Sequence, residues 1–287
     1  MNVAASLPVL LGLFSAITVA VANFTVKRGG DVLTARMVMS MGMALTMIPF
    51  APFVPAPPLA MWDSMAMAIA VHWVYQFAMV RALHRGGLSL VFPVMRGLSP
   101  LMTALMAPFM LGERLAPAGY LGLIIACTAL VVFALPGRQP LDQARLDRAA
   151  LVWAVLAAAG IGLYSVVDAR VAREMPQAAT FIVWLFLLDW IAVAAVVCWT
   201  RRGQLVARVR PQLKAGLWGG FAGSLSYGAA IYAFTLADAA LVTALRETSV
   251  VFAALLGWLF LKEGFGARRT LAAGALAGGL VLMQSGG

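Results

Sequence analysis

The sequence predicts an all-α integral membrane protein with ten transmembrane helices. Of its 287 residues, 63% are hydrophobic and only 11% are charged, whereas a soluble domain has about 25% charged residues. A water-soluble fold could not hide this much apolar surface, but a bilayer removes that constraint. Apolar stretches of about 20 residues, the length that spans a membrane, recur along the whole chain. They cover residues 7–26, 32–53, 61–83, 88–111, 115–135, 149–171, 177–200, 213–236, 239–261 and 267–284.

Several classes of protein are excluded by what the sequence lacks. The first apolar run has no basic residues ahead of it and no cleavage site, so we interpret it as a retained helix and not as a signal peptide. The sequence has no P-loop, no GxSxG element and no HExxH element, so neither ATP hydrolysis nor hydrolase chemistry is expected. Its two cysteines, Cys127 and Cys198, lie in separate spans. With two histidines they make a structural metal site improbable, and no cofactor is expected.

Basic residues are unevenly distributed between the loops, which predicts the orientation of the chain. The net charge of +10 could indicate nucleic-acid binding on a soluble protein, but here the basic residues flank membrane spans, so no nucleic-acid partner is expected. Odd-numbered loops hold most of the lysines and arginines, whereas even-numbered loops hold only Arg114, Arg170 and Arg173. Because loops rich in Lys and Arg stay in the cytoplasm, we expect both termini outside.

The two halves of the sequence are similar, which predicts an internal repeat. Residues 95–99, Met-Arg-Gly-Leu-Ser, parallel residues 245–249, Leu-Arg-Glu-Thr-Ser, and Glu113 parallels Glu263. Five helices per repeat would insert the repeats in opposite orientations. That arrangement is typical of secondary transporters, whose substrate site lies at the midplane between repeats. We therefore expect a first repeat at 1–136, a linker at 137–148 and a second repeat at 149–287.

Prolines and small residues predict which helices bend or pack closely. The fourth span contains three prolines, and because Pro removes a backbone hydrogen bond, we expect this span to bend and to line the site. Gly274 and Gly278 form a small-xxx-small pattern, which predicts a close helix contact in the last span. Glu113 and Glu263 lie at loop edges, where we expect them to cap or orient helices.

Five ionisable residues inside the apolar runs are the main candidates for a functional site, because such a residue usually faces a partner or a water-filled cavity. Arg96 and Arg246 occupy equivalent positions in the two repeats, so we expect them to flank a central cavity and bind a carboxylate or phosphate. The alternative is structural, with Glu247 or Asp189 paired to an arginine. Asp189, Glu247 and Asp168 are candidates for carrying a coupling proton or for serving as fixed counter-ions.

Polar and aromatic side chains in two further spans complete the candidate substrate site. His72 precedes Tyr75 by three residues and Gln76 by four, so these side chains share one face of the third span. Tyr227 and Tyr232 lie in the eighth span. Such groups either hydrogen-bond a neighbouring helix or line a cavity. For His72 both a packing role and a binding role stay open.

Several short motifs together resemble the drug/metabolite transporter superfamily, EamA type, whose members have ten helices in two repeats. The resemblance covers nearly the whole chain and implies export or exchange of a small metabolite without ATP, usually coupled to a proton or a counter-substrate. It also implies that both termini are cytoplasmic, the opposite of what the loop charges predict. The small multidrug pumps of this superfamily use a carboxylate in the first helix, whereas this chain has Asn23 near the end of that helix. The motifs are Asn23 with 27–30, then 82–83, 92–93, 96–97, 111–115, 240–242, 245–247, 250–257 and 262–263.

We therefore predict a secondary transporter, an exporter or exchanger of a small anionic or zwitterionic metabolite. Asn23 joins the substrate-binding candidates. The protein is expected to be a monomer in the cell membrane, which is the inner membrane in a Gram-negative cell. A lipid-linked sugar flippase of the same fold is the alternative and would need a cavity open to lipid. An intramembrane enzyme would need a metal-ligand set or a nucleophile–base pair, and the sequence offers neither.

Overall fold

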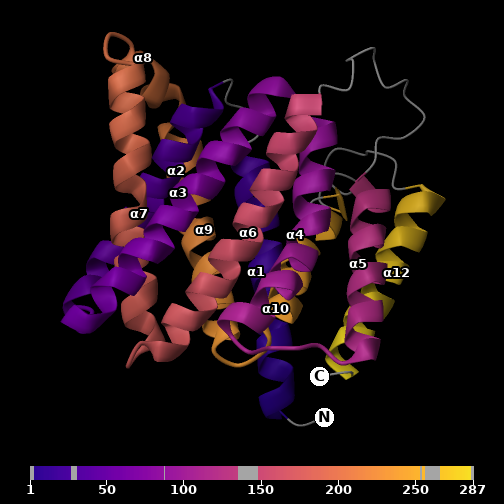
Figure 1. Cartoon of the computed structure of the whole chain (residues 1–287). Helices are drawn as coiled ribbons and strands as arrows, with labels where there is room; N and C mark the ends of the chain where they lie inside the picture. Colours follow the sequence, from indigo (N-terminus) through magenta and orange to yellow (C-terminus); the bar gives the residue numbers. More distant parts are fainter. Residues whose placement is uncertain are drawn as a thin grey trace. The chain divides into compact units, whose positions relative to one another are not determined.

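The computed structural model describes residues 3–26, 31–86, 88–134, 148–252, 254–255 and 266–285, and every regular element in these ranges is helical (Figure 1). Short 3-10 helices are η1 (Ile48–Phe53), η2 (Leu59–Met61) and η3 (Arg210–Gln212). The α-helices are α1 (Val3–Val26), α2 (Val32–Met47), α3 (Trp62–Arg85), α4 (Leu88–Met110), α5 (Pro117–Ala134), α6 (Arg148–Glu174), α7 (Ala178–Thr200), α8 (Leu205–Val209), α9 (Leu213–Phe234), α10 (Ala239–Glu247) and α12 (Ala267–Ser285).

The described helices confirm the predicted all-α membrane fold. By length and composition, the segments apolar enough to cross a membrane are Val32–Phe53, Leu59–Arg85, Pro117–Ala134, Arg148–Glu174 and Ala178–Thr200. Most described helix bounds agree with the apolar stretches of the sequence to within a few residues. The exception is the stretch 239–261, where α10 ends at Glu247 and residues 253 and 256–261 lie outside the described ones. The side chain of Asn23, Glu263 and nearly all of the predicted linker lie outside the described residues.

The chain divides into two compact units. Unit 1 comprises residues 1–73 and 168–236. Within it, α9 packs against α1 and α2, and α2 also packs against α7. The backbones of α2 and α9 touch: a Cβ atom added at Gly220 would lie 2.5 Å from the carbonyl oxygen of Met39. Between α2 and α7, Met37 and Val38 bury a cluster with Val193 and Val197.

Unit 2 comprises residues 74–167 and 237–287. In it α5 packs along α12, and α4 packs against both α5 and α10 (Figure 1). At the α5–α12 crossing, a Cβ atom at Gly122 would lie 2.4 Å from the carbonyl oxygen of Gly279. Among the described residues, Cβ atoms at Gly274 and Gly278 would meet nothing within 4 Å. The prediction that Gly274 and Gly278 make the close contact is therefore wrong, because the contacting face of α12 contains Gly279.

The interruption in regular helix falls in α10 and not in the proline-rich α4. Despite Pro93, Pro100 and Pro108, α4 is one continuous α-helix. In contrast, α10 ends at Glu247, and residues 249–252 are again helical after a turn at Thr248. At this turn the Thr248 hydroxyl donates a 2.6 Å hydrogen bond to the carbonyl oxygen of Leu245. The turn thus follows directly after the two buried charged residues Arg246 and Glu247.

Candidate functional site

A buried ion pair joins α4 to α10 in unit 2. The guanidinium Nη1 of Arg96 donates to both carboxylate oxygens of Glu247, at 3.1 Å and 3.2 Å. The Glu247 side chain is 1% exposed and that of Arg96 is 14% exposed. Burying such charges is tolerated only when they are paired and hydrogen-bonded. The sequence left open whether Glu247 or Asp189 would pair with an arginine, and the structure pairs Glu247 with Arg96.

Hydroxyl groups extend this ion pair into a polar seam between α4 and α10. The Ser99 hydroxyl donates to Glu247 Oε1 at 3.2 Å, and the Thr103 hydroxyl lies 3.5 Å from that of Thr243. The spacing of Arg96, Ser99 and Thr103 places all three on one face of α4. The seam therefore holds a row of buried polar groups that point from each helix to the other.

The seam has an acid on only one of its two helices, and packing explains why. In the repeat, the position equivalent to Glu247 is Gly97. A Cβ atom at Gly97 would lie 2.5 Å from Val131 Cγ2 on α5, so no larger side chain fits there without a shift. The carboxylate is therefore confined to α10.

Two tyrosines lie within electrostatic range of Arg96, and the second arginine lies within range of one of them. Arg246 is buried, and the rings of Tyr75 and Tyr164 meet edge to face with centroids 5.1 Å apart. Both tyrosines act electrostatically on Arg96, and Arg246 acts on Tyr164. Tyr75 reaches this position because Gly160 leaves room for it on α6, where an added Cβ would lie 3.1 Å from the Tyr75 backbone. Tyr164 was not singled out in the sequence, although it lies one helical turn before Asp168.

A second buried cluster lies in unit 1, where α3, α6 and α9 meet. Asp168 Oδ2 lies 2.8 Å from His72 Nε2 and accepts a hydrogen bond of 2.5 Å from the Tyr227 hydroxyl. The rings of His72 and Tyr227 are nearly perpendicular, with centroids 5.6 Å apart. Asp168 is fully buried. His72 and Tyr227, both predicted to bind substrate, are thus in direct contact with Asp168, predicted as a coupling residue or counter-ion.

Asp189 and Arg36 lie within electrostatic range of this cluster. Both groups act on the charge of His72. Asp189 is buried on α7, and its backbone carbonyl accepts a 3.1 Å hydrogen bond from the indole of Trp73, the residue next to His72. Asp189, predicted as a coupling residue or counter-ion, therefore neighbours His72 within unit 1.

Two other predicted binding residues are Tyr232, which is exposed, and Gln76, which is buried. Tyr232 is 47% exposed and comes five residues after Tyr227 on α9, so the two tyrosines point in different directions. Gln76 is buried on α3 in unit 2. Among the described residues, no three His, Cys, Asp or Glu side chains are placed to hold a metal ion.

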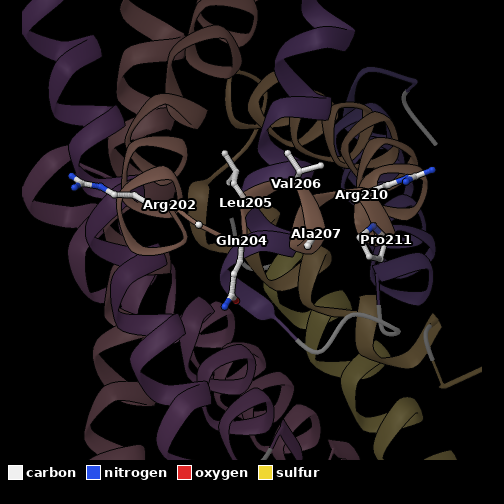
Figure 2. Close-up of a pocket in the computed structure, with 8 residues that line it drawn as sticks. Arg202, Gln204, Leu205, Val206, Ala207, Arg210 and Pro211 are labelled. Carbon is white, nitrogen blue, oxygen red and sulfur yellow. The ribbon is translucent and has the colours of Figure 1, made fainter.

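A surface hollow of about 440 Å³ lies on the connection between α7 and α9. Its lining includes Arg202 and Arg210 on either side of α8, with Gln204 and Val206 between them. Figure 2 shows the two guanidinium groups extending to opposite sides. Because they do not converge, this hollow lacks the paired cations of an anion site.

Comparison with known proteins assigns the family. The model of the EamA-like transporter family matches the chain twice, at residues 4–135 and 148–285. The chain belongs to this family. This EamA-like protein is thus a multi-pass membrane protein of a transporter family, and both buried clusters lie within the matched ranges. No curated protein matches its sequence.

The fold of this EamA-like protein recurs among solved structures. One, titled "Crystal structure of protein", is 19% identical in sequence with a TM-score of 0.74. The similarity covers 98% of this chain and 96% of the other. At this level of identity it establishes the fold alone.

Proposed function

We propose that this protein is a secondary transporter that exports or exchanges a small anionic or zwitterionic metabolite, whose acidic group binds Arg96 in the α4–α10 seam. The observation that carries the proposal is the Arg96–Glu247 pair with Arg246 beside it in sequence. A guanidinium binds carboxylate or phosphate in a planar, bidentate fashion, so the acidic group of such a substrate suits Arg96.

The seam also accounts for release of the substrate. Glu247 and the acidic group of the substrate would compete for the same guanidinium, so Arg96 is never left as an uncompensated buried charge. A zwitterionic substrate could in addition place its ammonium group on Glu247. A lipophilic cation would face two arginines and is disfavoured.

A transport assay with defined probes tests the proposal. The purified protein would be placed in liposomes and its exchange of labelled L-glutamate, L-leucine, succinate and glycerol 3-phosphate measured. We expect exchange of at least one of these, lost in Arg96→Gln. The matched control is Arg81→Gln, because Arg81 is an exposed residue of α3 in the same unit.

Two results would contradict the proposal. One is unchanged exchange by Arg96→Gln in protein that remains folded. The other is exchange of none of the acidic or zwitterionic probes together with movement of a lipid-linked sugar between leaflets, which would identify the flippase alternative.

A further inference from the structure

The His72–Asp168–Tyr227 cluster of unit 1 has no part in the substrate site proposed above. It is buried, it contains two titratable groups in contact, and it is built from three different helices. Such a cluster inside a membrane segment costs free energy and is usually functional. What it binds can be inferred from its hydrogen bonds and its charge.

The hydrogen bonds of Asp168 are unequally divided between its two oxygens. Oδ2 is hydrogen-bonded to His72 Nε2 and accepts a second hydrogen bond from the Tyr227 hydroxyl. Oδ1 is buried and has no hydrogen-bond partner among the described residues. A buried carboxylate normally has donors on both oxygens, and one that lacks them carries a desolvation cost. One added proton would neutralise the His72–Asp168 pair and so lower that cost.

Charged residues around the cluster favour the uptake of one proton. Among the described residues, the charged groups that act on His72 include Asp168 on α6, Asp189 on α7 and Arg36 on α2, and α9 contributes the Tyr227 hydroxyl. The remaining packed helix, α1, has no ionisable side chain. Of the groups named here, Asp168 and Asp189 carry one negative charge more than Arg36 balances, and one added proton on the His72–Asp168 pair offsets it.

We propose that His72, Asp168 and Tyr227 form the proton-coupling site of this transporter, separate from the substrate site at Arg96 and Glu247. In the loaded state the His72–Asp168 pair holds one proton more than in the unloaded state. That proton comes from water on one side of the membrane and returns to water on the other, so only an N–H or O–H bond forms and breaks. Because the two groups are coupled, the proton belongs to the pair. Tyr227 positions Asp168 through its hydroxyl. The inference rests on the proposed function only in that the chain is a secondary transporter.

Protonation of the cluster can be measured directly, because the chain has only two histidines. His84 is exposed in the last turn of α3, so His84→Gln leaves His72 as the single imidazole. NMR of ¹⁵N-histidine in lipid nanodiscs would follow its protonation from about pH 5 to about pH 9, the range in which histidine acts as a switch. We expect one protonation step, whose midpoint moves by about one pH unit or more in Asp168→Asn, as removal of a neighbouring charge requires. An imidazole that keeps one protonation state throughout would identify a permanent structural pair and overturn the proposal.

Transport assays can distinguish a defect in proton coupling from a defect in substrate binding. With a probe from the panel above that the wild type exchanges, Asp168→Asn should keep exchange but lose accumulation driven by a pH gradient. Tyr227→Phe, which keeps the ring and removes one hydrogen bond, should weaken accumulation with exchange unchanged, and it serves if Asp168→Asn does not fold. Loss of exchange in both variants, retention of gradient-driven accumulation in both, or a wild type indifferent to the gradient would each overturn the proposal. Normal exchange by Arg96→Gln would instead overturn the substrate site and leave this inference intact.

Discussion

Arg96 and Glu247 compensate each other's charge inside the apolar part of unit 2. The stability that this pairing provides can be measured. In Glu247→Gln an amide of the same shape faces an uncompensated guanidinium. Removing one partner of a buried ion pair lowers the free energy of unfolding by about 3–5 kcal/mol. We expect the purified variant to unfold at a temperature lower by roughly 5–10 °C.

The double variant Arg96→Gln with Glu247→Gln tests the same pair from both sides. Because it removes both charges of the pair, it should recover most of the stability lost in Glu247→Gln. The thermal unfolding of wild type, both single variants and the double variant gives the coupling energy. Effects of the single variants that simply add in the double variant would mean that the pair does not hold α4 and α10 together.

Asp31 holds a second network, at the start of α2, and it predicts a dependence of stability on pH. Its carboxylate accepts hydrogen bonds from the Thr34 backbone and hydroxyl, from Arg201 at 3.0 Å and from Arg208 at 3.1 Å. Burial alone would raise the pKa of Asp31, but these donors hold the pKa well below its ordinary value. The carboxylate therefore contributes its full stability above about pH 4 and loses it as the pH falls toward the folded-state pKa.

Asp31→Asn isolates this charge, because Asn is an equally good helix N-cap. We expect the variant to be less stable by about 1 kcal/mol, as for a partly exposed ion pair. The difference from wild type should be constant from about pH 5 to about pH 8 and should shrink below about pH 4. Thermal unfolding across this range checks it, with the exposed Asp63→Asn as control. A difference that grows toward acid pH would contradict the assignment.

At the scale of residues, the sequence could identify the important side chains but not their partners. Arg96, Glu247 and Asp168 stand out because an ionisable group in an apolar run is rare and costly. The pairs depend on how helices far apart in sequence pack. Asp189 was as plausible a partner for an arginine of the seam as Glu247, yet it lies in unit 1. Tyr164 was missed because an aromatic residue in a membrane helix is unremarkable until its neighbours are known.

At the scale of elements, helix bounds were predictable, whereas breaks and contact faces were not. Three prolines in α4 predict a bend, which remains a prediction, and the structure shows only that α4 is one continuous helix. The turn at Thr248 lies in a segment without proline. It forms beside the buried charges Arg246 and Glu247, as do the interrupted helices at transporter binding sites. No proline or glycine lies in residues 239–252, so a local sequence signal could not locate this turn.

The register of the α5–α12 crossing gives a prediction with a built-in control. A methyl group at Gly279 would lie 2.6 Å from the carbonyl oxygen of Gly122, whereas one at Gly278 would meet nothing within 4 Å. Gly279→Ala should therefore destabilise the protein by about 1–3 kcal/mol through overpacking. Gly278→Ala should stabilise it by up to about 1 kcal/mol through helix propensity. Melting temperatures in detergent compare the two, and equal effects would refute the assigned contact face.

At the scale of the whole molecule, the repeats of the sequence are not the compact units of the structure. Each unit combines helices from both repeats: α2 packs against α7 in unit 1, and α4 against α10 and α5 against α12 in unit 2. These partners occupy equivalent positions in the two repeats. Arg96 and Arg246 consequently come one from each repeat, as the sequence predicts, and both lie in unit 2. Sequence similarity reveals the duplication, but only the packing reveals this pairing.

The loop charges and the family resemblance predict opposite orientations of the chain in the membrane. Labelling at two surface positions decides between them. Gln177 is exposed in the even-numbered loop before α7, and its side chain makes no capping hydrogen bond. Gly203 is exposed in the odd-numbered loop after α7, with nothing within 4 Å of an added Cβ. A cysteine should fit at either position without disturbing the fold. The background would be Cys127→Ala with Cys198→Ala.

Since Lys and Arg resist translocation, we expect the basic loop that contains Gly203 to stay in the cytoplasm. A membrane-impermeant maleimide added to intact cells should then label Gln177→Cys at once and Gly203→Cys only after permeabilisation. The reverse pattern would place both termini in the cytoplasm and show that the loop charges do not set the orientation of this chain.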